Sequence, residues 1–236
     1  MRANIMITSN EVKNMALGLG AKLCGIAPVE RFKEAPNGFH PADIFPKTKS
    51  VVVLAKCFPE GPFHANSPVP YTAANDVQLN DVTRITCDLC VELERNDGLT
   101  AVPIPSEPYE YWDDERKEGK GILSLRHAGN LAGLGSIGKN SLLTNREYGN
   151  RLVLGAALLN VELEGDPTFD YQFCDDSCNL CIDSCPVSAI NDSTVNQKLC
   201  RGHSIYLTKK GYLLYVCNEC RKVCPNGSGI RLSKES

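Results

Sequence analysis

Two stretches near the end of the 236-residue chain, CNLCIDSCP at residues 178–186 and CNECRKVCP at residues 217–225, follow one pattern, Cys-x2-Cys-x3-Cys-Pro. Each stretch has one further cysteine upstream, Cys174 and Cys200. Eight of the 12 cysteines of the chain therefore fall between Cys174 and Cys224. Because such short spacings let neighbouring thiolates point towards one centre, these stretches decide how the last third of the chain folds.

The pattern predicts two [4Fe–4S] clusters, because each cluster needs four thiolates around one cube. In two-cluster ferredoxins the cysteine before the proline ligates the other cluster. Applied to this chain, the first set is Cys174, Cys178, Cys181 and Cys224, and the second set is Cys185, Cys200, Cys217 and Cys220. The x3 spacing after Cys174 and the 16 residues between Cys200 and Cys217 depart from the bacterial ferredoxin run.

Zinc sites and disulfides are the other uses of dense cysteine. Cys-x2-Cys is also a zinc spacing, but the duplicated and interlocked Cys-Pro endings favour iron–sulfur. Disulfides belong to oxidising compartments, and the segment from Met1 to Glu11 lacks the apolar region of a signal peptide. We therefore expect a cytoplasmic protein with reduced thiols.

The composition describes a globular protein, with 42% hydrophobic and 22% charged residues. The formal net charge is −3, which offers no broad electrostatic surface for nucleic acid or an anionic membrane. No apolar run approaches the length of a transmembrane helix. These features predict neither a membrane partner nor a nucleic-acid partner.

The sequence predicts two domains, residues 1–165 and 166–236, with the boundary at Gly165-Asp166-Pro167. The first domain reads as a mixture of helices and strands, with its four cysteines as core thiols. We expect helices over 10–18 and 75–96, and strands over 22–27, 50–56, 100–104 and 151–161. The strand over 50–56 is apolar enough to be buried on both faces.

A glycine-rich segment, GLGSIG at residues 133–138, matches two nucleotide-binding motifs only superficially. The dinucleotide motif must follow a strand, whereas residues 124–132 read as helix or irregular chain. A phosphate-binding loop needs Ser or Thr at the position of Asn140. A tight turn between packed elements and a backbone approach to a ligand both remain open.

Several segments together resemble the epoxyqueuosine reductases and their relatives. They are AGLGSIGKN (132–140), Glu147-Tyr148-Gly149, GIAP (25–28), KSVVVLA (49–55), AVPIPS (101–106) and the paired cysteine stretches. The resemblance covers about residues 10–226, and the family is also similar to the catalytic region of reductive dehalogenases. It implies an α+β protein, with a nitroreductase-like, corrinoid-binding α/β domain before a two-cluster, ferredoxin-like domain. The residues expected to bind the corrinoid are Gly133, Gly135, Gly138, Lys139 and Asn140.

Three departures from that family shape the functional prediction. Its proton-donating aspartate falls on Gly119, although Asp113 and Asp114 are nearby, and its usual tryptophan is Ser136. The chain stops 12 residues after Cys224, without the C-terminal helical repeats of the family. Two oxidised clusters would also bring the net charge to about −7. On these grounds we do not expect tRNA as a partner.

The leading functional prediction is an oxidoreductase that passes single electrons through two clusters to a corrinoid or a corrinoid-dependent substrate. Its partners would be an electron donor or acceptor protein, or a corrinoid protein. The first alternative is a ferredoxin-type electron-transfer protein without a corrinoid. The second alternative is an epoxyqueuosine reductase acting on tRNA.

Overall fold

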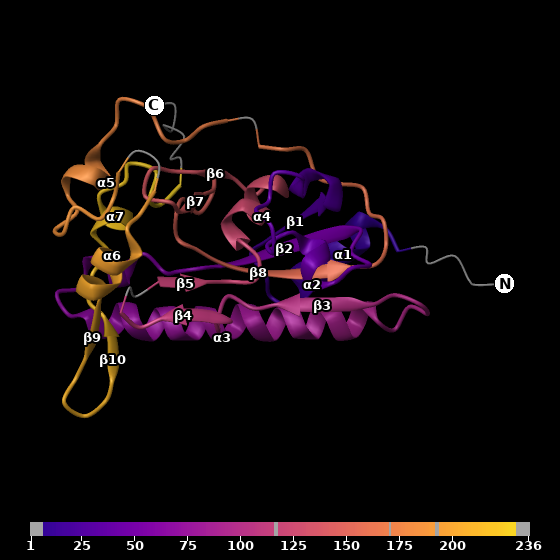
Figure 1. Cartoon of the computed structure of the whole chain (residues 1–236), viewed down its shortest axis with the longest axis horizontal. Coiled ribbons are helices and arrows are strands. Elements are labelled where there is room, and N and C mark those ends of the chain that lie inside the picture. Colours follow the sequence, from indigo (N-terminus) through magenta and orange to yellow (C-terminus); the bar gives the residue numbers. More distant parts are fainter. Residues whose placement is uncertain (1–6, 116–117, 170, 192–193, 230–236) are drawn as a thin grey trace, which may run out of the picture.

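A four-stranded antiparallel sheet forms the centre of the computed structural model, which describes residues 7–115, 118–169, 171–191 and 194–229. The strand order is β1 (Leu23–Pro28), β2 (Ser50–Cys57), β8 (Leu152–Leu159), β3 (Ala101–Ile104) (Figure 1). All four strands were predicted as apolar runs. Both faces of β2 and β8 are buried, as expected for β2, although their neighbours are antiparallel.

Each face of the sheet is covered by different elements. Helices α1 (Ser9–Gly18) and α3 (Pro68–Leu93) pack on one face, with Val52 and Leu54 of β2 in their apolar cluster. Helix α4 (Leu125–Leu131) covers the other face, with Val51 and Val53 in a second cluster. The alternation follows from the two-residue period of a strand, which sends successive side chains to opposite faces.

Helix α3 is longer than the predicted 75–96 helix at its N-terminal end. It begins at Pro68, where the Ser67 hydroxyl accepts a hydrogen bond from the Val69 amide. Proline is favourable there because the first-turn amides have no partner within the helix. Cys90 of this helix is buried as predicted, whereas Cys87 is exposed on its outer face.

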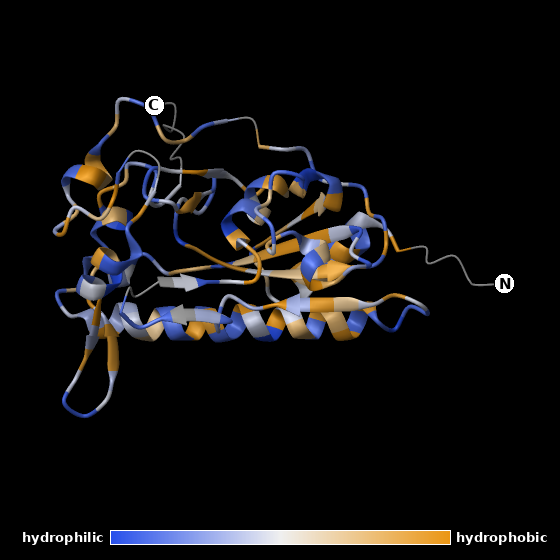
Figure 2. Cartoon of the chain, viewed as in Figure 1, coloured by the Kyte–Doolittle hydropathy of each residue, from blue (hydrophilic) through white to orange (hydrophobic). Residues whose placement is uncertain are grey.

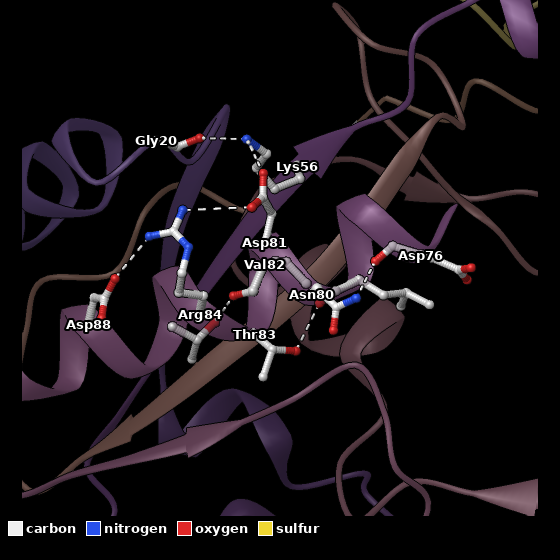
Figure 3. A network of polar contacts seen from close by, with 11 residues as sticks. Gly20, Lys56, Asp76, Asn80, Asp81, Val82, Thr83, Arg84 and Asp88 are labelled. Carbon is white, nitrogen blue, oxygen red and sulfur yellow. Dashed lines mark hydrogen bonds and ion pairs between the residues drawn. The ribbon is translucent and has the colours of Figure 1, made fainter. Parts of the chain in front are cut away.

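A polar network ties α3 to the end of β2 and to the turn between α1 and β1 (Figure 3). Lys56 Nζ lies 3.3 Å from Asp81 Oδ2 and donates to the Gly20 carbonyl. Arg84 continues the network to Asp88 at 3.0 Å. The Lys56 side chain is only 17% exposed, so its charge is compensated by a carboxylate and a carbonyl.

Short elements make up the rest of the chain. They are η1 (Val29–Phe32), α2 (Pro41–Ile44), η2 (Gly61–His64), the hairpin of β4 (Tyr111–Asp113) and β5 (Glu118–Lys120), the pair β6 (Ser136–Ile137) and β7 (Leu143–Thr144), and then α5 (Leu180–Asp183), α6 (Gln197–Ser204), β9 (Ile205–Leu207), β10 (Leu213–Tyr215) and α7 (Glu219–Lys222).

The last five elements gather at one end of the molecule, at the left of Figure 1. We call residues 166–229 the tail. Across the described ranges, no helix has both the length and the apolar composition to cross a membrane. The mixed helix-and-sheet class predicted from the sequence is confirmed.

Candidate functional site

The first set of cysteines surrounds one pocket of about 180 Å³. Cys174 and Cys178 come from the loop before α5, Cys181 from α5 itself, and Cys224 from the residue that follows α7 by two positions. The thiols influence one another, since Cys174, Cys224 and Cys178 each add to the rise that burial produces in the pKa of Cys181. These are the four residues that the sequence assigned to one cluster.

The second set also comes together. Burial raises the pKa of the Cys200 thiol in α6, and the neighbouring Cys217 and Cys185 raise it further. Burial likewise raises the pKa of Cys220 to about 11, with Cys200 and Cys217 among the charges that act on it. Cys185 Sγ accepts a hydrogen bond of 3.2 Å from the Ala189 amide. The structure thus brings members of each set near one another, and their ligation of two clusters stays a prediction.

All twelve cysteines are free thiols. In the described part of the chain, no group of three or more His, Cys, Asp or Glu side chains is arranged to hold a single metal ion. Metal ligation requires the thiolate, so a metal that binds these buried thiols must displace their protons.

The glycine-rich segment closes against the chain's own backbone. A Cβ atom on Gly135 would lie 2.1 Å from the Thr144 carbonyl oxygen, and one on Gly133 would lie 2.3 Å from that of Pro167. A Cβ atom on Gly138 would lie 3.9 Å from Cys174 Sγ, beside the first set of cysteines. Of the two roles left open for this segment, the tight turn is the one that these contacts support.

Lys139 and Asn140 hold the tail. Lys139 Nζ donates to the Asp176 carbonyl at 2.8 Å and to Asn179 Oδ1 at 3.0 Å, next to Cys178. Asn140 Nδ2 donates to the carbonyl of Cys220 at 3.1 Å. One residue therefore fixes the loop of the first set, and the next fixes a ligand candidate of the second set. The predicted role of these residues in binding a corrinoid is not tested by these contacts and stays a prediction.

Three asparagines that the sequence analysis did not single out make further contacts within and between the 133–150 segment and the tail. Asn145 Nδ2 donates to the Leu134 carbonyl at 2.6 Å and braces the glycine-rich turn. Asn150 Nδ2 donates to the Arg221 carbonyl at 3.4 Å, and Arg221 donates in return to the Asn150 carbonyl. Asn226 Nδ2 donates to the Phe173 carbonyl at 2.7 Å. Asn145 and Asn150 flank Glu147-Tyr148-Gly149, a segment that carried part of the resemblance, and this position was the sequence signal that could have identified them.

The position expected for a proton donor also contacts the tail. Gly119 lies in β5, and its amide donates to Gln197 Oε1 of α6 at 3.0 Å. Asp113 ends β4, opposite Glu118 in the register, and its Oδ1 accepts from the Glu115 amide at 2.9 Å. The β4–β5 turn therefore places Asp113 and Asp114 in a hairpin that contacts the cysteine-bearing helix α6.

Comparison with known proteins gives a consistent family name. No family model matches the chain. An epoxyqueuosine reductase of Lactococcus garvieae is 37% identical over 42% of this chain and 30% of its own length. One from Bacillus subtilis is 27% identical over 80% of this chain and 50% of its own length, and one from Leadbetterella byssophila is 28% identical over 94% and 81%. The chain thus spans 30% and 50% of the length of the first two relatives.

Solved structures share the fold. An epoxyqueuosine reductase from Streptococcus thermophilus gives a TM-score of 0.64 at 19% identity, covering 94% of this chain and 66% of that one. An epoxyqueuosine reductase with an epoxyqueuosine-modified tRNA-Tyr stem loop gives 0.61 at 20% identity, covering 95% and 67%. A reductive dehalogenase described as B12-dependent gives 0.65 at 18% identity, covering 94% and 32%.

These comparisons confirm the resemblance to epoxyqueuosine reductases and reductive dehalogenases that the sequence analysis stated. They contradict its leading functional prediction, electron transfer to a corrinoid, because the curated relatives carry the name epoxyqueuosine reductase. They also contradict the expectation that tRNA is not a partner, since one neighbour is bound to a tRNA stem loop. They favour the second alternative, an epoxyqueuosine reductase acting on tRNA.

Proposed function

We propose that the chain is an iron–sulfur oxidoreductase that reduces epoxyqueuosine in tRNA. The observation that carries the proposal is the docking of the cysteine-rich tail on residues 133–150, through Lys139, Asn140 and Asn150. Both segments are among those that carry the sequence resemblance. Residues 1–165 would form the nitroreductase-like domain, and residues 166–236 the two-cluster, ferredoxin-like domain.

Two [4Fe–4S] clusters are the proposed resident cofactors, and the residues fit them. One zinc ion would draw its four sulfurs to a single point about 2.3 Å away, whereas the first set of cysteines surrounds a pocket of about 180 Å³. Burial raises the pKa of the Cys224 thiol, and hydrogen bonds from the Asn226 amide and the Asn150 side chain to its sulfur offset part of that rise. Such hydrogen bonds stabilise negative charge on sulfur and so tune a cluster's potential.

A corrinoid belongs to the cofactor proposal because one neighbour of the same fold is described as B12-dependent. The residues assigned to it, Gly133 to Asn140, are held by the tail and by the backbone around Thr144. We therefore derive no step through a corrinoid. Adding hydroxocobalamin to the assay below tests whether one is required.

Reduction of an epoxide to an alkene consumes two electrons and two protons and releases the oxygen as water. Bound clusters would supply the electrons singly, and a low-potential one-electron donor would restore them. Lys139 and Asn140 hold the two cysteine sets in place relative to the glycine-rich turn. These contacts would thereby fix the distance over which electrons leave the proposed clusters. We assign proton supply to Asp113 and Asp114 at the end of β4, whose partner strand β5 contacts α6 through Gly119.

The test is turnover by the full chain, reconstituted anaerobically and supplied with a chemical reductant and an epoxyqueuosine-modified tRNA-Tyr stem loop. We expect about eight irons per wild-type chain and conversion of the nucleoside, measured by mass spectrometry with and without hydroxocobalamin. Cys220→Ala should lose about half the iron and all turnover. Cys87→Ala is the matched control, because Cys87 is exposed on α3. Iron-loaded protein that converts nothing under either condition contradicts the proposal.

A further inference from the structure

The β9–β10 hairpin projects from the cysteine-rich end of the molecule (Figure 1). Its base is anchored, because the Tyr215 amide donates to Thr72 Oγ1 of α3 at 2.9 Å and Tyr215 packs against the apolar cluster there. Cys200 precedes the hairpin in α6 and Cys217 follows it directly. The base of the hairpin is therefore close in the chain to two members of the second set of cysteines.

The tip of the hairpin is an ordered turn. The Thr208 amide donates to the Tyr212 carbonyl at 2.8 Å, and the Tyr212 amide donates to Thr208 Oγ1 at 2.9 Å. Gly211 takes a φ of +84°, which a side chain would strain. This turn holds Lys209 and Lys210, both exposed, in a fixed position at the end of the hairpin.

Large side chains cover the hairpin without being buried. Tyr212 and Leu207 are each 66% exposed and Tyr206 is 53% exposed. Figure 2 shows hydrophobic strands that end in a hydrophilic tip. An exposed surface of this kind on a structured element is typical of a binding site.

The charge of this segment is opposite to that of the whole chain. Residues 193–218 contain no Asp or Glu, but they contain four basic residues, Lys198, Arg201, Lys209 and Lys210. The whole chain has a formal net charge of −3. Lysines that contact phosphates, next to aromatic rings on which bases stack, form the usual surface for single-stranded RNA.

We propose that the β9–β10 hairpin binds the RNA substrate, with Lys209 and Lys210 on phosphates and Tyr212 stacked on an unpaired base of the loop. This inference rests on the proposed function, and it names the surface that brings the RNA to the second set of cysteines. Tyr206 adds a further exposed aromatic ring on the neighbouring strand, β9.

The test is binding of a fluorescent tRNA-Tyr anticodon stem loop to the reconstituted full chain over a range of salt concentrations. Lys209→Gln with Lys210→Gln should weaken binding about tenfold and lower the salt dependence by one to two units of slope. Tyr212→Ser should weaken binding about tenfold, while Tyr212→Phe keeps the ring and should bind as wild type. Lys33→Gln with Lys47→Gln removes two exposed lysines from the other end of the chain and serves as the charge control.

The outcomes separate this inference from the proposed function. Wild-type protein that binds and converts the stem loop, with hairpin variants that bind equally well, contradicts the hairpin proposal alone. Wild-type protein that neither binds nor converts it contradicts both. Hairpin variants that keep RNA affinity but accept electrons more slowly from a reduced ferredoxin would assign the surface to a protein partner and overturn the RNA proposal.

Discussion

At the scale of single residues, the glycines of the 133–138 segment differ in how closely neighbouring atoms approach the place where a side chain would begin. Gly135→Ala would place a methyl group 2.1 Å from the Thr144 carbonyl, a backbone atom that cannot move without opening the β6–β7 pair. We expect a loss of about 2 kcal/mol or more in the free energy of unfolding. Gly18→Ala is the control, since nothing lies within 4 Å of that position. Urea denaturation measures both, and equal stability of the two variants would contradict the packing argument.

The residues of this segment show what could be read from the sequence. Three closely spaced glycines indicated a close backbone approach, and the structure shows that the approach is made by the chain itself, near Thr144 and Pro167. We call the part of the chain before the tail, up to residue 165, the body. The contacts of Lys139 and Asn140 could not be predicted, because they depend on how the tail folds back over the body. The two sets of cysteines were predicted from the Cys-x2-Cys-x3-Cys-Pro pattern and the two-cluster ferredoxin rule, and their ligation of clusters stays a prediction.

At the scale of elements, the start of the tail is bound to α1, β1 and η1 through Asp166. Asp166 accepts hydrogen bonds from Lys13 Nζ at 2.6 Å and from the Ile26 amide at 2.9 Å. Arg31 donates to the Asp166 carbonyl and to the Leu131 carbonyl, both at 2.7 Å. The segment at the predicted domain boundary is thus joined to α1, β1 and α4.

Removing the Asp166 carboxylate should therefore destabilise the fold. Asp166→Ala deletes one charged and one backbone hydrogen bond at a partly buried site, and we expect a loss of about 2 kcal/mol in the free energy of unfolding. Glu162→Ala removes the partner of Lys49 in an exposed ion pair, whose side chains are 52% and 81% exposed. That control should change stability by less than about 0.5 kcal/mol. Similar losses for both variants would show that the boundary segment is not specifically fastened.

The long apolar strands were predicted well because hydrophobic runs of that length have few alternatives. Their antiparallel order was not predicted, because it depends on contacts between strands far apart in the sequence. The β4–β5 and β9–β10 hairpins were missed, since strands of three residues carry little periodicity. The start of α3 was missed because Pro68 and Pro70 were not read as part of a helix. Ser67 before a proline is nevertheless a recognised signal for the beginning of a helix.

At the scale of the whole molecule, net charge was a poor guide to the partner. A value of −3 averages over all 236 residues and conceals the hairpin segment, which carries basic residues alone. Binding of a polyanion depends on the local field at the surface it meets. The expectation against tRNA relied in part on this average, and the comparison with a neighbour bound to a tRNA stem loop contradicts that expectation.

The body and the tail also differ in what holds them together. The body has two apolar clusters, one on each face of the central sheet. Among the described residues of the tail, the buried hydrophobic side chains are Phe173, Cys181, Ala189 and Ile190. Helices α5 and α7 have four residues each, too few to be stable without tertiary support. We therefore expect the tail to depend on the proposed metal ligation and on the Asn140 and Asn150 contacts with the body.

This difference predicts that loss of iron unfolds the tail and leaves the body folded. Thiolate–metal bonds supply folding free energy directly, whereas the apolar clusters of the body are independent of metal. In hydrogen exchange measured by mass spectrometry, we expect tail peptides to exchange much faster in chelator-treated protein than in reconstituted protein. Peptides from β2 and β8 should keep their protection in both forms. Equal loss of protection in β8 and in α6 would instead mean that the chain folds as one cooperative unit, and the division near residue 165 would then be wrong.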